Sequence, residues 1–362
     1  MSSLRLEDTM NTLFQCHIPI SPAQNRRLAR ACVGILLASD CRFPKIARRL
    51  PSPVSQAGRV RFLQRLLSAP FVTQTHVYQP WLRRMVRGIQ EGTWHLVIDR
   101  STLEGYNAEW LLIGLAYRQH AIPLVWEVID FGCTSAAEQI ALWRRVLPLI
   151  PPDCHVIAHG DSEFGSVAVM RFLREQGWDF ILGQAANTRY RHYGQADWKL
   201  LANLAVPKRG TLYLPRVEWT QQHRYGPLNV FAFYAPHQNS PESLRRDYRY
   251  CATTLPTTYN LRRLGRRRWS IECCFKDFKS AGWNIELSHI RHLERRDTLL
   301  TLLSMVYLWA TGIGRWLCKV GKRREVDAHP TRHLSLFRIG WDWLVSQFSQ
   351  GHDWPLVSTL YS

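Results

Sequence analysis

Residues 93–184 constrain the fold more than any other part of the chain. Three runs rich in apolar, β-branched and aromatic residues, WHLVID, EWLLIGLAYRQ and AIPLVWEVIDF, follow one another with short polar turns between them. Runs of this composition predict three consecutive β-strands. The chain then alternates, because AAEQIALWRRVLPLI and SVAVMRFLREQG have helical spacing whereas CHVIAHG and WDFILGQ have the character of short strands.

Three strands followed by alternating helix and strand is the element order of a ribonuclease-H-like α/β core. We therefore expect an α/β fold with one such domain at residues 93–320. Inside it the alternation stops at about residues 185–250, where GTLYLPRVEWTQQHRYGPLNVFAFYAP predicts a β-rich insertion. Helices are expected at about residues 257–281 and 293–320, and a C-terminal helix with a tail at residues 321–362.

The residues before this core, 1–92, predict a helical and basic region. Apolar residues recur at helical spacing in RRLARACVGILLAS, RVRFLQRLLSA and YQPWLRRMVRGI. Between residues 21 and 90, thirteen residues are Lys or Arg and only Asp40 is acidic. Since phosphate contacts dominate nucleic-acid affinity, this region is a candidate DNA-binding domain. The alternative is a basic face that meets only solvent.

The whole chain carries excess positive charge. It has 47 Lys and Arg against 28 Asp and Glu, a formal charge of +19 and a pI near 10.0. Such a charge attracts polyanions, first nucleic acid and second an anionic membrane. The best apolar stretch, 298–314, is shorter than the roughly 20 residues that a membrane span needs, so a buried core helix and no membrane partner are expected. Acidic residues in MSSLRLEDTMNTLFQ are unlike a secretory signal and predict a cytoplasmic protein.

Two aspartates follow predicted strands. Asp99 is expected at the end of the first strand, in VIDRST, and Asp161 follows a later strand in GDSEFG, at a turn that opens a helix. Strand ends in open α/β sheets are where ligands usually bind. Taken singly, each aspartate is more often a turn former or a helix cap. The two together are candidates for one site.

A third carboxylate, Glu272, lies in the basic segment LGRRRWSIECCFKDFKSAGW. At 3.6 residues per turn this segment has one charged face and an apolar stripe beside it. The charged face comprises Arg268, Glu272, Lys276 and Lys279, and the stripe comprises Ile271, Phe275 and Phe278. By itself such a face is typical of a solvated row of ion pairs. If the stripe packs on the sheet, however, Glu272 is carried toward the two aspartates.

Three carboxylates that meet repel one another unless cations neutralise them. Hard oxygen ligands suit Mg²⁺ or Mn²⁺. Two such ions, roughly 3.5 to 4 Å apart, can activate a water or a DNA 3′-hydroxyl and stabilise the leaving oxygen of a phosphoryl displacement. We therefore predict Asp99, Asp161 and Glu272 as catalytic and metal-binding residues. Arg268 and Lys279 would hold phosphates beside the ions instead of only pairing with Glu272.

These residues resemble a known family, the DDE transposases of insertion sequences, and specifically the insertion-sequence-four family. The likeness covers about residues 94–317 and rests on four pieces in order, VIDRST, AIPLVWEVID, VIAHGDSEFG and RRWSIECCFKDFKSAGWNIELSHI. The family's helix motif is Tyr, two residues, Arg, three residues, Glu, six residues, Lys. Arg268, Glu272 and Lys279 match this motif, whereas Gly265 stands in place of the Tyr.

The resemblance implies a cut-and-paste DNA transposase of a bacterial insertion sequence. Enzymes of this type nick the element end, form a hairpin with the freed 3′-hydroxyl, reopen it and join the end to target DNA. The implied partners are double-stranded DNA, both element ends and target, and a second copy in a homodimer on paired ends. The implied location is the bacterial cytoplasm, at the nucleoid.

Other DNA contacts are expected from Lys276 and Arg266. Hairpin formation bends the DNA end sharply, and a flipped base stacked on an aromatic ring relieves that bend. Trp219 in the insertion is the predicted stacking residue, with Trp198 next. Core packing is the alternative interpretation for either ring.

Three other functions compete with a transposase. A metal-dependent nuclease would use the same carboxylates and cut without joining. A transposase-derived regulator would bind DNA without activity, although three intact carboxylates favour an enzyme. A basic RNA-binding scaffold is the third, and the sequence has no aromatic platform motif for it.

Overall fold

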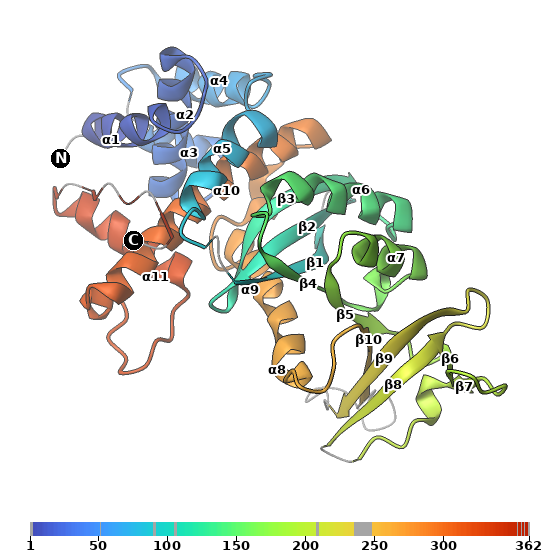
Figure 1. The fold of residues 1–362 in the computed structure, drawn as a ribbon. Coiled ribbons are helices and arrows are strands. Elements are labelled where there is room, and N and C mark those ends of the chain that lie inside the picture. Colours follow the sequence, from blue (N-terminus) through green and yellow to red (C-terminus); the bar gives the residue numbers. More distant parts are fainter. Residues whose placement is uncertain are drawn as a thin grey trace.

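A ten-stranded sheet runs through the computed structural model, which describes residues 3–50, 52–89, 92–104, 107–207, 210–234, 248–352, 354–355, 357 and 359–360. The strand order is β3-β2-β1-β4-β5-β10-β9-β8-β6-β7, and helices accompany one half of the sheet (Figure 1). The chain is therefore a mixed α/β protein.

The first five strands lie where the sequence predicts strands. β1 (Thr93–Leu103), β2 (Ala108–Tyr117) and β3 (His120–Asp130) form an antiparallel meander. β4 (His155–Gly160) then pairs in parallel with β1, and β5 (Asp179–Gln184) pairs in parallel with β4. β2 and β3 are almost continuously buried. Strands covered on both faces have this pattern, because neither face needs polar residues.

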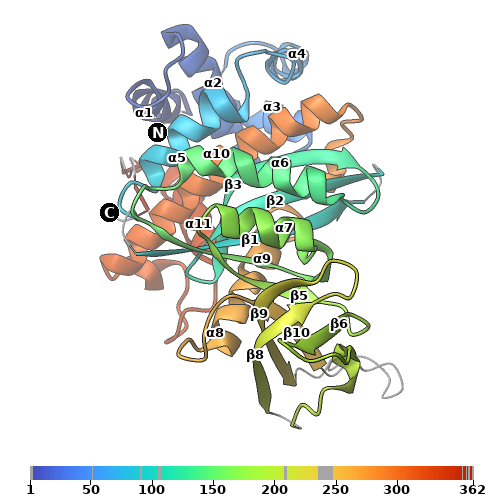
Figure 2. The ribbon, with the colours of Figure 1, turned by 45° about the vertical axis from the view of Figure 1, so that its right-hand side comes forward.

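Helices cover the two faces of this half of the sheet. α6 (Ala136–Val146) and α7 (Val167–Glu175) lie on one face, whereas α9 (Trp269–Phe278) lies on the other (Figures 1 and 2). Ser135 starts α6 through a capping box with Glu138. A polar residue of β1 therefore faces either α6 and α7 or α9, depending on its place in the strand's alternation.

The expected insertion at residues 185–250 is β-rich in its described part, and it extends the core sheet. It contains β6 (Arg189–His192), β7 (Lys199–Leu200), β8 (Thr211–Trp219), β9 (Tyr225–Tyr234) and the start of β10 (Tyr248–Thr253). β10 pairs with β5 in antiparallel fashion, Tyr250 opposite Gln184. The alternation of helix and strand stops here because these strands continue the hydrogen-bonded ladder directly. Residues 208–209 and 235–247 of this range lie outside the described residues.

The basic segment forms a shorter and less regular helix than the predicted 257–281. α8 (Leu261–Gly265) leads through a 3-10 turn, η6 (Arg266–Arg268), into α9. It starts at residue 261 because the Asn260 side chain accepts the Arg263 N–H at 3.0 Å, an N-cap. The predicted length was wrong at both ends, since propensity alone does not locate caps.

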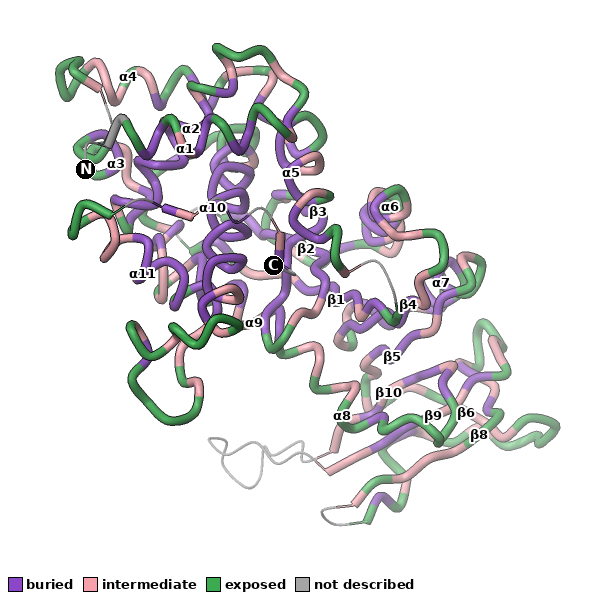
Figure 3. The backbone as a smooth tube through the Cα atoms, turned by 60° about the vertical axis from the view of Figure 1, so that its left-hand side comes forward, coloured by how far each residue is buried: buried purple, intermediate pink, exposed green. Residues whose placement is uncertain are grey.

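α10 (Leu293–Lys319) matches the second predicted helix and is a core helix. By length and composition it could cross a membrane, but 94% of its most apolar window is buried inside the protein (Figure 3). α11 (Leu336–Ser349) packs along it with backbones in contact. A Cβ on Gly314 would lie 1.9 Å from the Leu336 carbonyl oxygen, and one on Gly340 would lie 1.8 Å from that of Ala310. Only glycine permits this approach.

Helices also occupy the residues before β1. They are α1 (Ser3–Gln15), α2 (Pro22–Ala38), α3 (Phe43–Arg49), α4 (Gln56–Leu66), the π-helical turn η1 (Gln74–Tyr78) and α5 (Gln79–Met85). α2, η1 and α5 contact α10, so this region is packed on the same core helix as the sheet.

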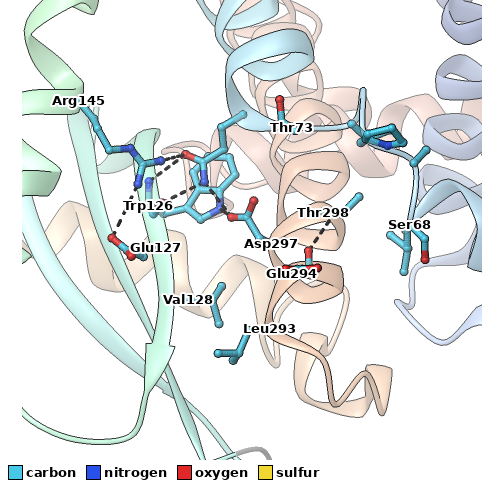
Figure 4. Close-up of a pocket in the computed structure, with 15 residues that line it drawn as sticks. Ser68, Thr73, Trp126, Glu127, Val128, Arg145, Leu293, Glu294, Asp297 and Thr298 are labelled. Atoms are coloured by element: carbon cyan, nitrogen blue, oxygen red, sulfur yellow. Dashed lines mark hydrogen bonds and ion pairs between the residues drawn. The ribbon is translucent and has the colours of Figure 1, made fainter.

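Gln74 joins this helical region to the sheet. Its side-chain amide donates to the Trp126 carbonyl oxygen at 3.0 Å and accepts the Trp126 N–H at 3.3 Å, which satisfies backbone groups of the edge strand β3. It also donates to Asp297 on α10 and accepts from Arg145 on α6, both at 2.8 Å. A cavity of about 500 Å³ lies at this junction (Figure 4). None of the predicted site residues lines it.

Candidate active site

Asp99 lies within β1, and the prediction that it ends the strand was wrong. The strand continues to Leu103 because pairing with β2 continues, with Asp99 opposite Leu112 and Leu103 opposite Ala108. Pairing with the parallel strand β4 stops earlier, at Val97. Asp99 is thus two residues past the end of the β1/β4 ladder, at the carboxyl end of the parallel strands.

Asp161 occupies the matching position on the neighbouring strand. The ladder with β1 ends at His159, so Asp161 is also two residues past it. Its side chain caps the short 3-10 turn η3 (Ser162–Phe164) by accepting the Glu163 N–H at 2.9 Å. The cap that the sequence allowed as an alternative is therefore present, and it orients the carboxylate at the strand end.

α9 packs on the sheet through its predicted apolar stripe. Ile271, Phe275 and Phe278 are buried. The Trp110 ring of β2 lies 5.1 Å from the Phe275 ring and 4.9 Å from the Phe278 ring, measured between centroids. This contact carries the charged face of the helix to the side of β1.

Arg268 bridges the strand and the helix. Its Nη1 donates to Asp99 Oδ2 at 2.8 Å and its Nη2 donates to Glu272 Oε1 at 2.6 Å. One guanidinium therefore brings Glu272 to the first aspartate. The i,i+4 pair with Glu272 is the ion pair that the helical spacing allowed, and the bond to Asp99 is the tertiary contact that the spacing alone could not reveal.

The three carboxylates act on one another electrostatically. Asp99 is 8% exposed, and burial raises its pKa to about 6. The Arg268 guanidinium opposes this rise, whereas the negative charges of Asp161 and Glu272 add to it. The site thus holds more negative charge than one guanidinium compensates.

This donor set suits a divalent cation in its chemistry. All three groups are carboxylates, and a cation among them would offset the negative charges of Asp161 and Glu272, which add to the rise that burial causes in the pKa of Asp99. Among the residues that the structure describes, no three His, Cys, Asp or Glu side chains lie close enough together to hold a metal ion. The positive charge between Asp99 and Glu272 is that of Arg268.

A histidine pair lies on the same two strands. His95 Nδ1 and His159 Nε2 are 3.0 Å apart. Burial, followed by the charge of Arg267, lowers the pKa of His95 to about 4, and burial lowers that of His159 well below its usual value. Both rings are therefore neutral at neutral pH and add no positive charge beside the aspartates. The sequence analysis did not single them out.

The other basic residues predicted to contact DNA differ in whether their side chains are free to do so. Lys279 is engaged within the protein, because its Nζ contacts the Thr102 carbonyl oxygen and lies 2.8 Å from Glu286 Oε1. Lys276 and Arg266 are exposed. Gly265 has helical dihedral angles, and a Cβ added there would meet nothing within 4 Å. The first atom of a side chain at this position would therefore meet no obstacle.

Trp219 lies where it cannot stack on a base in this conformation, so the structure corrects that prediction. The side chain is fully buried, at 0% exposure, where β8 pairs with Tyr190 of β6. Hence the core-packing alternative describes Trp219. Trp198 is half-buried, with the Arg191 guanidinium 4.9 Å from its ring centroid.

The exposed tryptophan beside the carboxylates is Trp269, which the sequence analysis missed. It is 61% exposed, at the start of α9, and its ring centroid lies 6.0 Å from the Arg268 guanidinium. Its position two residues before Ile271 puts it off the apolar stripe, which was the available signal.

The chain was compared with curated proteins, with solved structures and with family models. A search of curated proteins found no match. Among solved structures, a similar chain is that of the "piggyBac transposase synaptic complex with hairpin DNA", with a TM-score of 0.46, 9% identity, and coverage of 97% of this chain and 78% of that chain. The family model described as "Transposase DDE domain" matches residues 92–309, more than half of the chain, including all three carboxylates. On this match, the protein belongs to the DDE-domain transposase family.

Proposed function

We propose that the protein is a cut-and-paste transposase whose catalytic residues are Asp99, Asp161 and Glu272. Its family consists of enzymes that cleave and transfer DNA and that are metal-dependent in general. The observation that carries the assignment of residues is that Arg268 joins the carboxylates of Asp99 on β1 and Glu272 on α9, while Asp161 occupies the matching position directly after the neighbouring parallel strand β4. The negative charges of Asp161 and Glu272, which add to the rise that burial causes in the pKa of Asp99, support the same assignment.

Two Mg²⁺ or Mn²⁺ ions are the proposed cofactors, held by these three side chains. When bound, they supply an activated water or 3′-hydroxyl and charge stabilisation for the leaving oxygen. Arg268 then binds DNA phosphate through the planar guanidinium that now bridges two carboxylates. The exposed Lys276 and Arg266 contact the phosphate backbone.

The proposal includes the finer fold and family. The order β3-β2-β1-β4-β5, antiparallel for three strands and parallel thereafter, supports a ribonuclease-H-like core. The sequence motifs around Asp99, Asp161 and Glu272 support the insertion-sequence-four family. A hairpin intermediate, a homodimer on paired ends and a location at the bacterial nucleoid follow from that membership.

The test is an excision assay in cells with a reporter interrupted by the element's own ends. Wild type is compared with Glu272→Gln and with Glu175→Gln, a matched change of an exposed glutamate on α7. We expect precise excision with wild type and Glu175→Gln and none with Glu272→Gln. End binding in a gel shift should be retained by all three, because it rests on the basic surface.

Excision by Glu272→Gln at the wild-type rate would remove Glu272 from the site. Purified protein with Mg²⁺ and element ends separates the competing nuclease from a transposase. A transposase joins cleaved ends to a target plasmid, whereas the nuclease leaves only cleaved ends.

A further inference from the structure

The two aspartates lie beyond the backbone hydrogen bonds that join their strands. The last ladder pair between β1 and β4 is Val97 with His159. From there on, backbone pairing between these two strands does not hold Asp99 and Asp161 at a set separation. Metal affinity is sensitive to such placement, because loss of a group that orients a ligand typically lowers it by about 10-fold to 100-fold.

One ion pair spans this gap. The Arg100 N–H donates to Asp99 Oδ1 and the Glu163 N–H donates to Asp161 Oδ1, each at 2.9 Å. The side chains of the same two residues meet each other, with Arg100 Nε 2.6 Å from Glu163 Oε2. Thus the two backbone amides that bind the two carboxylates belong to residues joined by one charged contact.

The pair is itself held firmly. Arg100 Nη1 donates to the Gly132 carbonyl oxygen at 2.8 Å and lies 3.1 Å from Oε1 of Glu109, whose side chain is 1% exposed. Glu163 Oε1 accepts the Thr134 N–H at 3.2 Å and the Thr134 hydroxyl at 2.9 Å. Each charged group therefore has several partners, so its orientation is over-determined.

The pair works from the face opposite to the carboxylates. Side chains alternate along a strand, so Arg100 points away from the face to which Asp99 points. Asp99 meets Arg268 on the α9 side. Arg100 instead meets Gly132, which lies between β3 and α6, and Glu163, which follows β4. Their contact with the site therefore runs through the backbone amides.

We propose that Arg100 and Glu163 are a positioning pair that fixes Asp99 and Asp161 relative to each other and so sets the affinity of the site for divalent cations. The inference rests on the proposed metal-binding role of the two aspartates. It assigns no catalytic role to the pair itself.

The test uses the full chain with Glu163→Gln and Arg100→Lys. Glu163→Gln keeps the side-chain volume and an acceptor oxygen but removes the negative charge. Arg100→Lys keeps the positive charge but removes the planar guanidinium with its several N–H donors. Asp327→Asn is the matched control, because it weakens a buried ion pair elsewhere, in which Arg323 Nη1 lies 3.1 Å from Asp327 Oδ2. Three quantities are measured: Mn²⁺ affinity by electron paramagnetic resonance, hydrogen exchange of the amides of residues 100 and 163, and affinity for element-end DNA.

We expect Glu163→Gln to lower the Mn²⁺ affinity by about 10-fold to 100-fold, as loss of a group that orients a ligand does. Exchange of the two amides should accelerate, and end binding should stay at the wild-type value. Arg100→Lys should do the same to a smaller extent, and the double variant should lose less affinity than the sum of the two single losses, because both changes break the contact between Arg100 and Glu163. Asp327→Asn should alter none of the three quantities.

Wild-type Mn²⁺ affinity and wild-type exchange in Glu163→Gln would overturn the proposal, even if the variant melted at a lower temperature. Failure of the proposed function has a different signature, because wild type and Asp99→Ala would then bind Mn²⁺ equally poorly. In that case hydrogen exchange alone tests whether Arg100 and Glu163 hold the two amides in place. Wild-type exchange in Glu163→Gln would overturn that role.

Discussion

Replacing Asp99 by Asn should make the metal-free protein more stable at neutral pH while it abolishes DNA cleavage. Asp99 is 8% exposed, and burial first of all raises its pKa from 3.8 to about 6. Ionising it therefore costs more in the folded protein than in the unfolded chain. Since one pKa unit corresponds to about 1.36 kcal/mol, the ionised carboxylate lowers the free energy of unfolding by about 3 kcal/mol.

The sign of the pH dependence follows from the direction of the shift. Between pH 3.8 and about 6 the folded protein holds a proton on Asp99 that the unfolded chain has released. This contribution to stability is lost as the pH rises through that window, and above it the full penalty applies. The pairing with Arg268 is already included, because its charge opposes the rise in pKa. Asp99→Asn should thus exceed wild type by up to about 3 kcal/mol at pH 8, with a smaller difference at pH 5.

Urea unfolding with EDTA, at pH values from 5 to 8, measures this difference directly. Adding Mg²⁺ should then stabilise wild type, because a ligand that binds only the folded state raises the free energy of unfolding, and it should stabilise Asp99→Asn much less. If Asp99→Asn were no more stable than wild type at pH 8, pairing with Arg268 would outweigh burial and the reasoning would be refuted.

Five further changes address other parts of the protein. Trp269→Ala should weaken binding of element ends by about 1 to 3 kcal/mol, measured by gel shift, without loss of stability. Trp219→Ala, in the core, should lower the free energy of unfolding in urea by about 3 to 5 kcal/mol. Gly265→Tyr should fold, since a Cβ there meets nothing within 4 Å, and should speed end cleavage; an unchanged rate would count against a tyrosine contact at this position. Gly340→Ala should lower the Tm because its Cβ would lie 1.8 Å from the Ala310 carbonyl oxygen, whereas Gly265→Ala should gain about 0.5 to 1 kcal/mol.

Much of the fold could be predicted from local patterns. The three apolar runs of residues 93–130 are strands, and residues 293–319 are one helix, because burial demands continuous apolar stretches there. The end of β1 could not be predicted, since Asp99 and the polar residues after it look like a turn. They remain in the strand because β2 offers partners as far as Ala108.

Those parts of the candidate site that lie on one helix could be predicted from residue spacing. Those parts that depend on contacts with another strand or helix could not. Glu272 and Arg268 are one helical turn apart, and the apolar stripe beside them indicated which side would pack. The prediction for Trp219 failed because its exposure depends on a partner strand. Alternation in β8 distinguishes two faces, but only the neighbouring strand decides that Trp219 is the buried one. Likewise, Arg100 and Glu163 are 63 positions apart, so no local pattern connects them.

A net charge of +19 and an acidic site are compatible because basic side chains lie on the surface whereas the first site carboxylate is buried. The exposed Lys276 and Arg266 lie on the surface, where they attract DNA at long range, whereas Asp99 is buried and faces a single guanidinium. Binding and chemistry are therefore separable for most residues. Arg268 is the exception, because it pairs with Asp99 and Glu272 in the metal-free protein and, in the proposed function, binds phosphate once cations take its place beside them. By linkage, cations and DNA should then bind more tightly together than apart, since each favours the same displacement of one side chain.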